Sequence, residues 1–474
     1  MITQLNERPQ GQRFMTDQTE KIDLNRRDFL KGGSMAGMMA MMASGATAFK
    51  PADANAQSSK PPIGPPVKFG VIGCGYHGRD IVGTLAVLPN APVVAICDHY
   101  GAFLRRTGRS APEATKYENY KDLLADENVE AVVVATPSHQ HKDIVIDALK
   151  AGKHVYCEAP IASSIEDARA IALAAKNTPK QYFQAGLQYR SDPQRHFLVD
   201  YVRTGAWGHS IFARAQWHKK TSWKRAAPSN EREREINWRL NNKTSCGIAG
   251  EIGIHLLDAN NWFLSGRPSA VSGFGSNLLW KDGRDVPDTA QVTLEYPDGV
   301  QSYVDITLCN SFDSEYEMYH GTDSALMVRG SQAWMFKEAD APMLGWEVYA
   351  KKDTFHKEVG IYLVANATKL TTVTGSGEEA AKASPFTDTP LWYALEAFVH
   401  NAYVHQSGVE DFIASFGDTD DEILGEYLAE LEGSKKPAAG YQLGFEANVI
   451  AVKAHEATMN NKRIELDDSL FALG

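Results

Sequence analysis

The chain has 474 residues, of which 43% are hydrophobic and 23% charged, and its formal net charge is −11 at pH 7. This is ordinary globular composition in a chain long enough for two or three domains. The acidic balance and the lack of a dense Lys/Arg patch argue against a nucleic-acid-binding surface. Five cysteines without a Cys-x-x-Cys pair give no pattern of a disulfide framework.

The first 56 residues resemble a targeting segment rather than part of the fold. Arg26 and Arg27 lie in an Asn-Arg-Arg-Asp-Phe-Leu-Lys run, an apolar stretch follows from Gly32 to Phe49, and Ala54-Asn55-Ala56 offers a cleavage site. This order is typical of a twin-arginine signal peptide, and a disordered tail with a chance arginine pair is the alternative. We therefore expect the twin-arginine machinery to export the folded protein to the periplasm. The apolar stretch is short and contains glycines, so no permanent membrane span is expected.

A proline-rich linker is expected at residues 57–66, and strand and helix patterns alternate strictly after it. Buried strands are predicted at Val67–Ile72, Val93–Cys97, Ala131–Ala135, His154–Cys157 and Tyr182–Gly186. Helices are predicted at Gly78–Leu88, at Tyr120–Leu124 behind an Asn119 cap, at Lys142–Ala151, and up to Ala175 from a capping box of Ser163 and Glu166. This alternation predicts an α/β fold with a doubly wound parallel sheet, the Rossmann arrangement, over residues 67–187.

The pattern changes after Gln188. Helices are expected at Asp192–Arg203, Gly250–Leu264 and Gly444–Asn460, a polar surface loop from Lys219 to Glu235, and an exposed acidic helical insertion at Glu410–Lys436. Strands are expected at Ser210–Trp217, within Met318–Met335, and at Val292–Tyr296 and Val300–Leu308, which flank the hairpin signal Pro297-Asp298-Gly299. Residues 188–474 are thus predicted to form an α/β domain with a large, open, mostly antiparallel sheet.

The segment Gly73-Cys74-Gly75-Tyr76-His77-Gly78 has the Gly-x-Gly-x-x-Gly spacing and lies between a predicted strand and a predicted helix. In such a turn Gly73 allows the sharp bend, Gly75 lets the backbone approach a diphosphate, and Gly78 lets helix and strand pack closely. The helix N-terminus offers free N–H groups to the phosphates. Asp98 ends the next strand, 20 residues after Gly78, where a carboxylate accepts hydrogen bonds from a ribose 2′-hydroxyl. NAD is therefore favoured over NADP, and the alternative is a structural glycine turn with a surface aspartate.

Two further motifs, Ala135-Thr-Pro-Ser-His-Gln-His141 and Ala151-Gly-Lys-His-Val-Tyr-Cys-Glu-Ala-Pro160, resemble the glucose–fructose oxidoreductase, inositol dehydrogenase and MocA-like (Gfo/Idh/MocA) family. The resemblance runs from Val67 through Leu264 and more loosely beyond. It implies a Rossmann domain followed by an α/β domain whose open sheet binds substrate and often mediates homo-oligomers. It places Thr136, Pro137 and His141 along the path of the cofactor and Glu158 near the nicotinamide ribose. His139 and Ala159 belong to the same motifs, and for the two histidines a structural role at the helix entry is the alternative.

Glu251, His255 and Asp258 are candidates for the catalytic group. On one continuous helix Glu251 and His255 share a face, and Asp258 can orient the His255 ring so that its free nitrogen acts as a base. Oxidation of an alcohol needs such a base. The Gfo/Idh/MocA family usually has Asp-x-x-x-His here, so Glu251 stands in the aspartate position by resemblance. A buried histidine with a structural role is the alternative.

Candidate substrate residues lie on either side of this group. By resemblance Trp238 and Arg239 stand at the edge of the substrate pocket, where an indole suits a sugar ring and a guanidinium binds hydroxyls or a carboxylate. Gln188 and Arg190 follow the last predicted parallel strand and could face the same pocket. For all four residues the alternative to substrate binding is a structural role, through packing or a salt bridge. No metal site is predicted.

One departure from the family leaves the reaction open. The family usually has Glu-Lys-Pro where this chain has Glu158-Ala159-Pro160, and the lysine normally donates to the reacting oxygen. Some NAD-dependent glycosidases of the same broad family also lack it. We therefore expect an exported NAD-dependent oxidoreductase of a sugar or polyol with a tightly held cofactor. A redox-cycling glycosidase or lyase and a non-catalytic NAD-binding module are the alternatives.

Overall fold

The computed structural model describes residues 65–345, 347, 352–355, 358–362, 386–418 and 421–473. The predicted signal peptide lies outside these residues. Among the described helices, none combines the length and the apolar character that crossing a bilayer requires.

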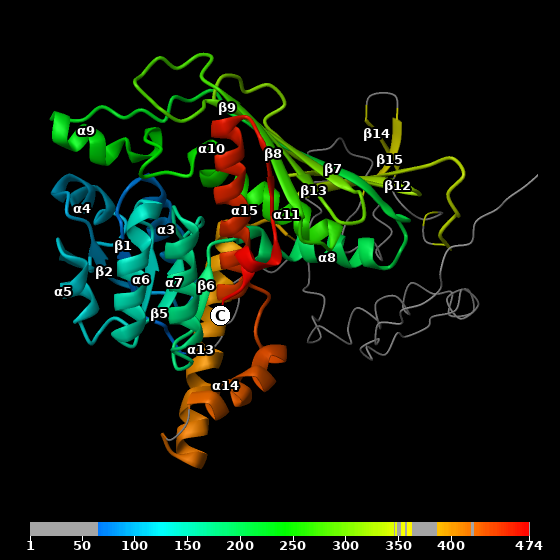
Figure 1. Cartoon of the computed structure of the whole chain (residues 1–474). Coiled ribbons are helices and arrows are strands. Elements are labelled where there is room, and N and C mark those ends of the chain that lie inside the picture. Colours follow the sequence, from blue (N-terminus) through cyan, green and yellow to red (C-terminus); the bar gives the residue numbers. More distant parts are fainter. Residues whose placement is uncertain are drawn as a thin grey trace, which may run out of the picture. The chain divides into compact units, whose positions relative to one another are not determined.

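The first half of the described chain builds a six-stranded parallel sheet in the order β3-β2-β1-β4-β5-β6 (Figure 1). Its strands are β1 Phe69–Ile72, β2 Val93–Cys97, β3 Thr115–Tyr117, β4 Ala131–Val134, β5 His154–Cys157 and β6 Phe183–Ala185. Its helices are α3 Tyr76–Leu85, α4 Gly101–Thr107, α5 Tyr120–Leu124, α6 His141–Lys150 and α7 Ile165–Lys176. β1, β4 and β5 are buried along their whole length, as strands covered by helices on both faces must be. The predicted doubly wound parallel sheet is confirmed.

Two details of this half differ from expectation. Short β3 and α4 were not predicted, because three partly exposed residues and one seven-residue helix carry little periodic signal. The cap of α7 is Ser164 and not Ser163: its Oγ accepts a hydrogen bond from the Asp167 N–H at 3.1 Å. The predicted Asn119 cap of α5 is present, with its Oδ1 accepting from the Lys121 N–H at 3.0 Å.

The second half builds a ten-stranded sheet in the order β14-β15-β13-β12-β11-β7-β10-β9-β8-β16. All its pairings are antiparallel except β7 with β10, which confirms the predicted mostly antiparallel sheet. The strands are β7 Ser210–His218, β8 Ala270–Ser276, β9 Thr289–Glu295, β10 Gln301–Thr307, β11 Glu315–Gly321, β12 Ser324–Arg329, β13 Gln332–Lys337, β14 Lys352–Phe355, β15 Glu358–Tyr362 and β16 Arg463–Glu465. The helices are α8 Pro193–Arg203, α9 Asn230–Ile236, α10 Gly247–Glu251, α11 Gly253–Leu264, α13 Pro390–Phe416, α14 Asp421–Glu430 and α15 Tyr441–Asn460. The short 3₁₀ turns are η1 Ser138–Gln140 in the first half and, in the second, η2 Gln188–Ser191, η3 Trp238–Leu240, η5 Leu431–Ser434 and η6 Asp468–Phe471.

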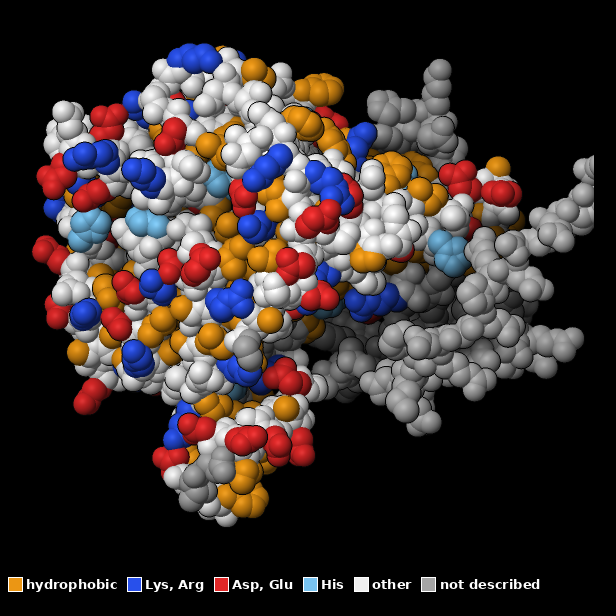
Figure 2. Space-filling view, in the orientation of Figure 1, with side chains coloured by type: hydrophobic (Ala, Val, Ile, Leu, Met, Phe, Trp, Pro, Cys, Tyr) orange, Lys and Arg blue, Asp and Glu red, His pale blue; other side chains and the backbone are white. Residues whose placement is uncertain are grey.

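The two C-terminal helices α13 and α15 return to the first sheet. α13 adds Leu395 and Phe398 to the core beneath β1, where the Phe398 and Phe69 rings lie 5.8 Å apart. α15 packs between α7 and β8. Its Gly444 lies against Ala185 so closely that a Cβ would come within 2.6 Å. The segment expected as an exposed insertion is the end of α13 together with α14 and η5, and it projects from the rest of this part of the chain in Figures 1 and 2.

Candidate functional site

The glycine turn between β1 and α3 is packed on one side and open on the other. Gly73 has φ +100°, and a Cβ there would lie 2.6 Å from the carbonyl carbon and oxygen of Ala135. A Cβ on Gly78 would lie 1.8 Å from the Gly73 oxygen. At Gly75 a Cβ would meet nothing within 4 Å. The turn therefore leaves its free face to a group that needs close approach to the backbone, which fits a dinucleotide diphosphate at the start of α3.

Asp98 fixes the end of β2 beside this turn. Its Oδ2 accepts a hydrogen bond from the Cys74 N–H at 2.9 Å, and its Oδ1 accepts one from the Tyr100 N–H at 2.8 Å. The carboxylate is thus held in place by backbone donors on both sides. A carboxylate fixed here suits a ribose diol and opposes a 2′-phosphate, as NAD requires.

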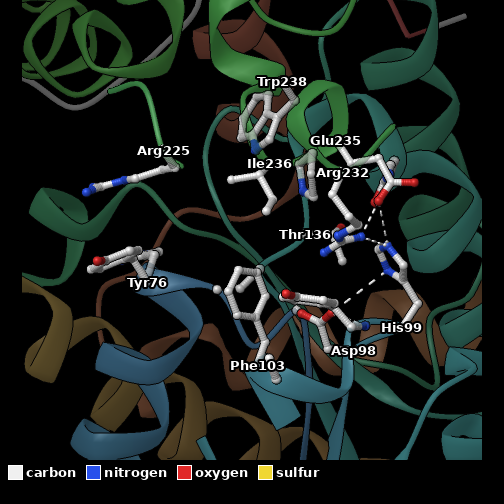
Figure 3. Close-up of a pocket in the computed structure, with 18 of the residues that line it drawn as sticks. Tyr76, Asp98, His99, Phe103, Thr136, Arg225, Arg232, Glu235, Ile236 and Trp238 are labelled. Atoms are coloured by element: carbon white, nitrogen blue, oxygen red, sulfur yellow. Dashed lines mark hydrogen bonds and ion pairs between the residues drawn. The ribbon is translucent and has the colours of Figure 1, made fainter. Parts of the chain in front are cut away.

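A pocket of about 970 Å³ opens in front of the turn (Figure 3). The first half contributes the turn, the loop after β2 and the loop after β4, and the second half contributes side chains from residues 223–239. Of the residues singled out from sequence, the pocket is lined by Gly73, Gly75, Tyr76, His77, Asp98, Thr136, Pro137, Trp238 and Arg239. Its walls therefore combine the nucleotide-binding turn with an aromatic and basic surface from the other half of the chain.

Glu158, at the end of β5, is paired with His77 of the glycine turn. Their Oε1 and Nε2 atoms lie 2.9 Å apart and form an ion pair. The Glu158 charge raises the pKa of His77. Burial alone would raise the pKa of Glu158, but His77, His255 and His141 outweigh it and lower that pKa below its ordinary value. Glu158 is therefore an anion at neutral pH, surrounded by imidazoles.

His139 and His141 support the loop after β4 and do not line the pocket. His141 donates from Nε2 to the Thr136 carbonyl at 2.8 Å, its Nδ1 lies 3.5 Å from the Cys157 sulfur, and its burial lowers its pKa. His139 donates from Nδ1 to the Thr244 carbonyl at 3.1 Å. These bonds favour the structural alternative considered for both rings.

The expected pairing of Glu251 with His255 is not found. The backbone breaks at Ile252, which ends α10 before α11 begins, so the two side chains are not successive turns of one helix. Glu251 Oε1 accepts hydrogen bonds from the Ser138 hydroxyl at 2.8 Å and from the Cys246 N–H at 3.2 Å. Among the described residues no hydrogen bond or ion pair joins Glu251 to His255. Glu251 thus ties the start of η1 to the second half, and its burial raises its pKa.

The expected orientation of His255 by Asp258 is also not found. Asp258 is bound at both oxygens by Arg190, with Nε–Oδ2 at 2.9 Å and Nη2–Oδ1 at 2.8 Å. Arg190 also lies 4.7 Å from the centroid of the Trp262 ring. It is a structural partner of α11, which is the alternative considered for it. Asp258 acts on His255 only through its charge.

His255 is partly buried on α11 and is not among the residues that line the pocket. Burial lowers its pKa, while the charges of Glu158 and Asp258 act in the opposite direction. The edge of its ring faces Tyr189, with the centroids 6.1 Å apart. The Tyr189 hydroxyl donates to Glu315, and Tyr189 belongs to η2, which begins at Gln188. A neutral imidazole beside a buried carboxylate can accept a proton and be stabilised once charged.

Trp238 and Arg239 form the side of the pocket nearest to Glu251. The Arg239 guanidinium lies 4.3 Å from the centroid of the Trp238 ring, and its Nε lies 3.8 Å from Glu251 Oε2. Trp238 is almost fully buried, whereas the Arg239 side chain is 45% exposed. An indole face and an accessible guanidinium together can bind a polyhydroxylated ring.

Sequence reasoning missed the part of residues 219–235 that reaches the pocket. This stretch was expected to be a surface loop, but it contains α9 and the lining residues Trp223, Arg225, Arg232 and Glu235. A Ser229 cap followed by Glu231 and Glu233 in the first turn is a helix-start signal that could have indicated α9. No local sequence pattern indicates that α9 lies at the pocket.

Comparison with known proteins agrees with this geometry. Residues 67–186 match the model described as "Oxidoreductase family, NAD-binding Rossmann fold" of Gfo/Idh/MocA, and residues 198–335 match the Gfo/Idh/MocA C-terminal domain. An inositol 2-dehydrogenase of Rubrobacter xylanophilus is 30% identical over 227 residues, which are 47% of this chain and 59% of that protein. A 2,7-anhydro-N-acetylneuraminate hydratase of Escherichia coli is 27% identical over 272 residues, 55% of this chain and 67% of that protein. The chain thus spans about three fifths to two thirds of the length of these relatives.

The fold also has a solved counterpart. A levoglucosan dehydrogenase in complex with NADH superposes with a TM-score of 0.59 at 18% identity, covering 85% of this chain and 99% of that one. This likeness concerns the fold. With the family match and the open glycine turn, it makes the first half an NAD-binding domain.

Proposed function

Because the chain belongs to the Gfo/Idh/MocA family, we propose that it is an NAD-dependent oxidoreductase acting on a sugar or polyol hydroxyl. The observation that carries the proposal is His255, a partly buried imidazole with a lowered pKa that interacts electrostatically with Glu158, the partner of His77 in the glycine turn. The names of its relatives, an inositol 2-dehydrogenase and a levoglucosan dehydrogenase, support a polyhydroxylated substrate.

The proposed chemistry divides between cofactor and protein. A dinucleotide held by the glycine turn and Asp98 would supply the acceptor for the hydride that leaves the carbon carrying the hydroxyl. His255 takes the hydroxyl proton, and its lowered pKa keeps it neutral and ready to do so at pH 7. The negative charges of Glu158 and Asp258 then stabilise the imidazolium that forms. Trp238 and Arg239, which line the pocket, orient the substrate ring.

Replacing His255 by alanine tests this assignment. We expect NADH formation with sugars and polyols to fall at least about 100-fold, the usual contribution of a general base, while NAD binding stays within a few-fold of wild type. His209→Ala, an exposed histidine in the loop before β7, is the matched control and should change neither quantity. Unchanged turnover in the His255 variant would remove the ring from the chemistry.

Export to the periplasm is a second part of the proposal. Its support is the order of arginine pair, apolar run and Ala-x-Ala site in residues 25–56. Lysines in place of Arg26 and Arg27 should retain the full-length protein in the cytoplasm, whereas the wild type should appear in the periplasmic fraction as a shortened chain. Equal distribution of both proteins would contradict the twin-arginine route.

A redox-cycling glycosidase or lyase is the second candidate, and Ala159 in place of the family lysine favours it. One relative is named a hydratase rather than a dehydrogenase. Such an enzyme should release the leaving group from chromogenic glycosides without net NADH, whereas the oxidoreductase should accumulate NADH from free sugars. Bound NAD without either reaction would indicate a non-catalytic module.

Self-association is also proposed, because three strands of the second sheet expose apolar side chains on one face. Phe212 on β7 is 38% exposed, Tyr303 on β10 36% and Phe274 on β8 62%. Apolar side chains exposed together on one face mark interaction surfaces. Sedimentation equilibrium of the full chain should therefore give more than the 52.1 kDa of one copy.

A further inference from the structure

Residues 223–239, here called the bridging segment, belong to the second half of the chain but form one wall of the nucleotide pocket (Figure 3). α9 fastens this segment to the loop after β2. Arg232 Nη1 lies 2.7 Å from His99 Nε2, and its guanidinium carbon lies 4.0 Å from the centroid of the Tyr100 ring. Glu235 Oε2 lies 3.3 Å from the same His99 nitrogen. The bridging segment is thus fixed beside Asp98, at the ribose end of the pocket.

Arg225 is held at the other end of this segment. Its N–H donates to Asn237 Oδ1 at 2.6 Å, and its carbonyl accepts from Asn237 Nδ2 at 3.0 Å. Asn237 is buried, so the backbone of Arg225 has a firm anchor. The Arg225 guanidinium carbon lies 4.2 Å from the centroid of the Tyr76 ring, and Tyr76 directly follows Gly75 (Figure 3). A cation from the second half of the chain therefore lies on the ring of the residue that follows Gly75, and both line the pocket.

The charge of Arg225 is not neutralised as those of its neighbours are. Lys224 pairs with Glu233 at 3.0 Å, and Arg232 pairs with Glu235. Among the described residues no carboxylate lies within ion-pair distance of Arg225. Its charge is also repelled by that of Arg239 on the same wall. An anion on the pocket side would relieve this repulsion and supply the missing partner.

We propose that Arg225 binds the diphosphate of the dinucleotide from the side opposite the glycine turn. A guanidinium presents a planar pair of N–H donors that matches two phosphate oxygens. Because stacking on Tyr76 already restricts the orientation of this side chain, less conformational entropy is lost on binding. The turn and α3 contact the diphosphate from one half of the chain, and Arg225 contacts it from the other. The cofactor is then held between the halves, which gives a physical basis for tight retention.

The test measures binding and needs no turnover, so it stands apart from the proposed reaction. The full chain, freed of nucleotide, is titrated with NADH, with ADP-ribose and with adenosine. In Arg225→Ala we expect NADH and ADP-ribose, which carry the diphosphate, to bind about 10- to 100-fold more weakly, since one charge-assisted contact is lost. Adenosine carries no phosphate and should bind as it does to wild type.

Arg234→Ala is the matched control, because Arg234 lies on α9 of the same segment but not in the pocket wall. It should bind all three ligands like wild type. Unchanged NADH binding by Arg225→Ala overturns the proposal. An equal loss for adenosine also overturns it, because that result assigns Arg225 a structural role in the bridging segment. If the alanine variant does not fold, Arg225→Gln keeps part of the aliphatic stem and a polar end without the charge, and answers the same question.

Discussion

Replacing Gly75 by alanine separates the cofactor site from the fold. Gly75 has φ −67° and ψ −160°, which alanine adopts without strain, and a Cβ there meets nothing within 4 Å. At the start of a helix, alanine stabilises the fold less than glycine does by about 1 kcal/mol. Alanine also lowers the conformational entropy of the unfolded chain, which stabilises the folded state by about 0.4–1 kcal/mol. The free energy of unfolding without nucleotide should therefore change by less than about 1 kcal/mol.

Nucleotide affinity should respond differently to the same methyl group. The methyl would occupy the open face of the turn, where the backbone must approach the diphosphate. If it displaces two N–H to phosphate bonds of about 1.5–3 kcal/mol each, binding weakens by about 3 kcal/mol or more, which is a factor of about 100 or more. Urea unfolding gives the first quantity and the fluorescence of bound NADH gives the second.

Two other glycines complete this experiment. Gly83→Ala lies in the same helix with equally open surroundings and does not line the pocket, so it should keep NADH binding. Gly73→Ala should lose stability as well as binding, because φ +100° strains alanine by about 1–2 kcal/mol and its Cβ would lie 2.6 Å from Ala135. NADH binding by Gly75→Ala within three-fold of wild type would refute the assignment of the diphosphate to this turn.

Two further predictions concern charges around His255. Asp258→Asn should lower the free energy of unfolding by about 3 kcal/mol, because it leaves Arg190 buried without its carboxylate; an unchanged urea midpoint would show that the pair contributes nothing. The stabilising effect of the His77–Glu158 pair should be greatest between pH 4.5, the ordinary pKa of Glu, and pH 6.5, that of His. It should fall as pH rises through the raised pKa of His77 and as pH drops through the lowered pKa of Glu158, so the stability difference between wild type and His77→Gln should peak in that window. A difference independent of pH would contradict the ion pair.

The parts of the site built from neighbouring residues were predictable from sequence. The glycine turn, the Asp98 position and the strands that hold them follow from local spacing, and the structure places them together. The α10–α11 break was not predictable in the same way. The i, i+4 argument for Glu251 and His255 assumed one continuous helix, and nothing in the local pattern shows that Ile252 interrupts it.

Long-range partners were also beyond the sequence argument. Arg190 and Asp258 lie 68 positions apart, and Ser138 and Glu251 lie 113 apart. Each pairing depends on how the halves pack. The residue types alone do not indicate which distant side chain each one binds. For the same reason Arg225 looked like an ordinary surface residue of a polar stretch.

The path of the last helix has a consequence for how this chain matures. α15 packs against α7, its buried Asn448 accepts a hydrogen bond from the Ala162 N–H at 3.0 Å, and β16 completes the edge beside β8. Until residues 441–465 have left the ribosome, the apolar side chains of the first half that α15 covers remain exposed. Domains usually acquire their structure from the N-terminus during synthesis, yet here a helix that covers the first half is synthesised after strands β7 to β15. The proposed twin-arginine route, which carries folded proteins, suits a chain whose interior closes this late in synthesis.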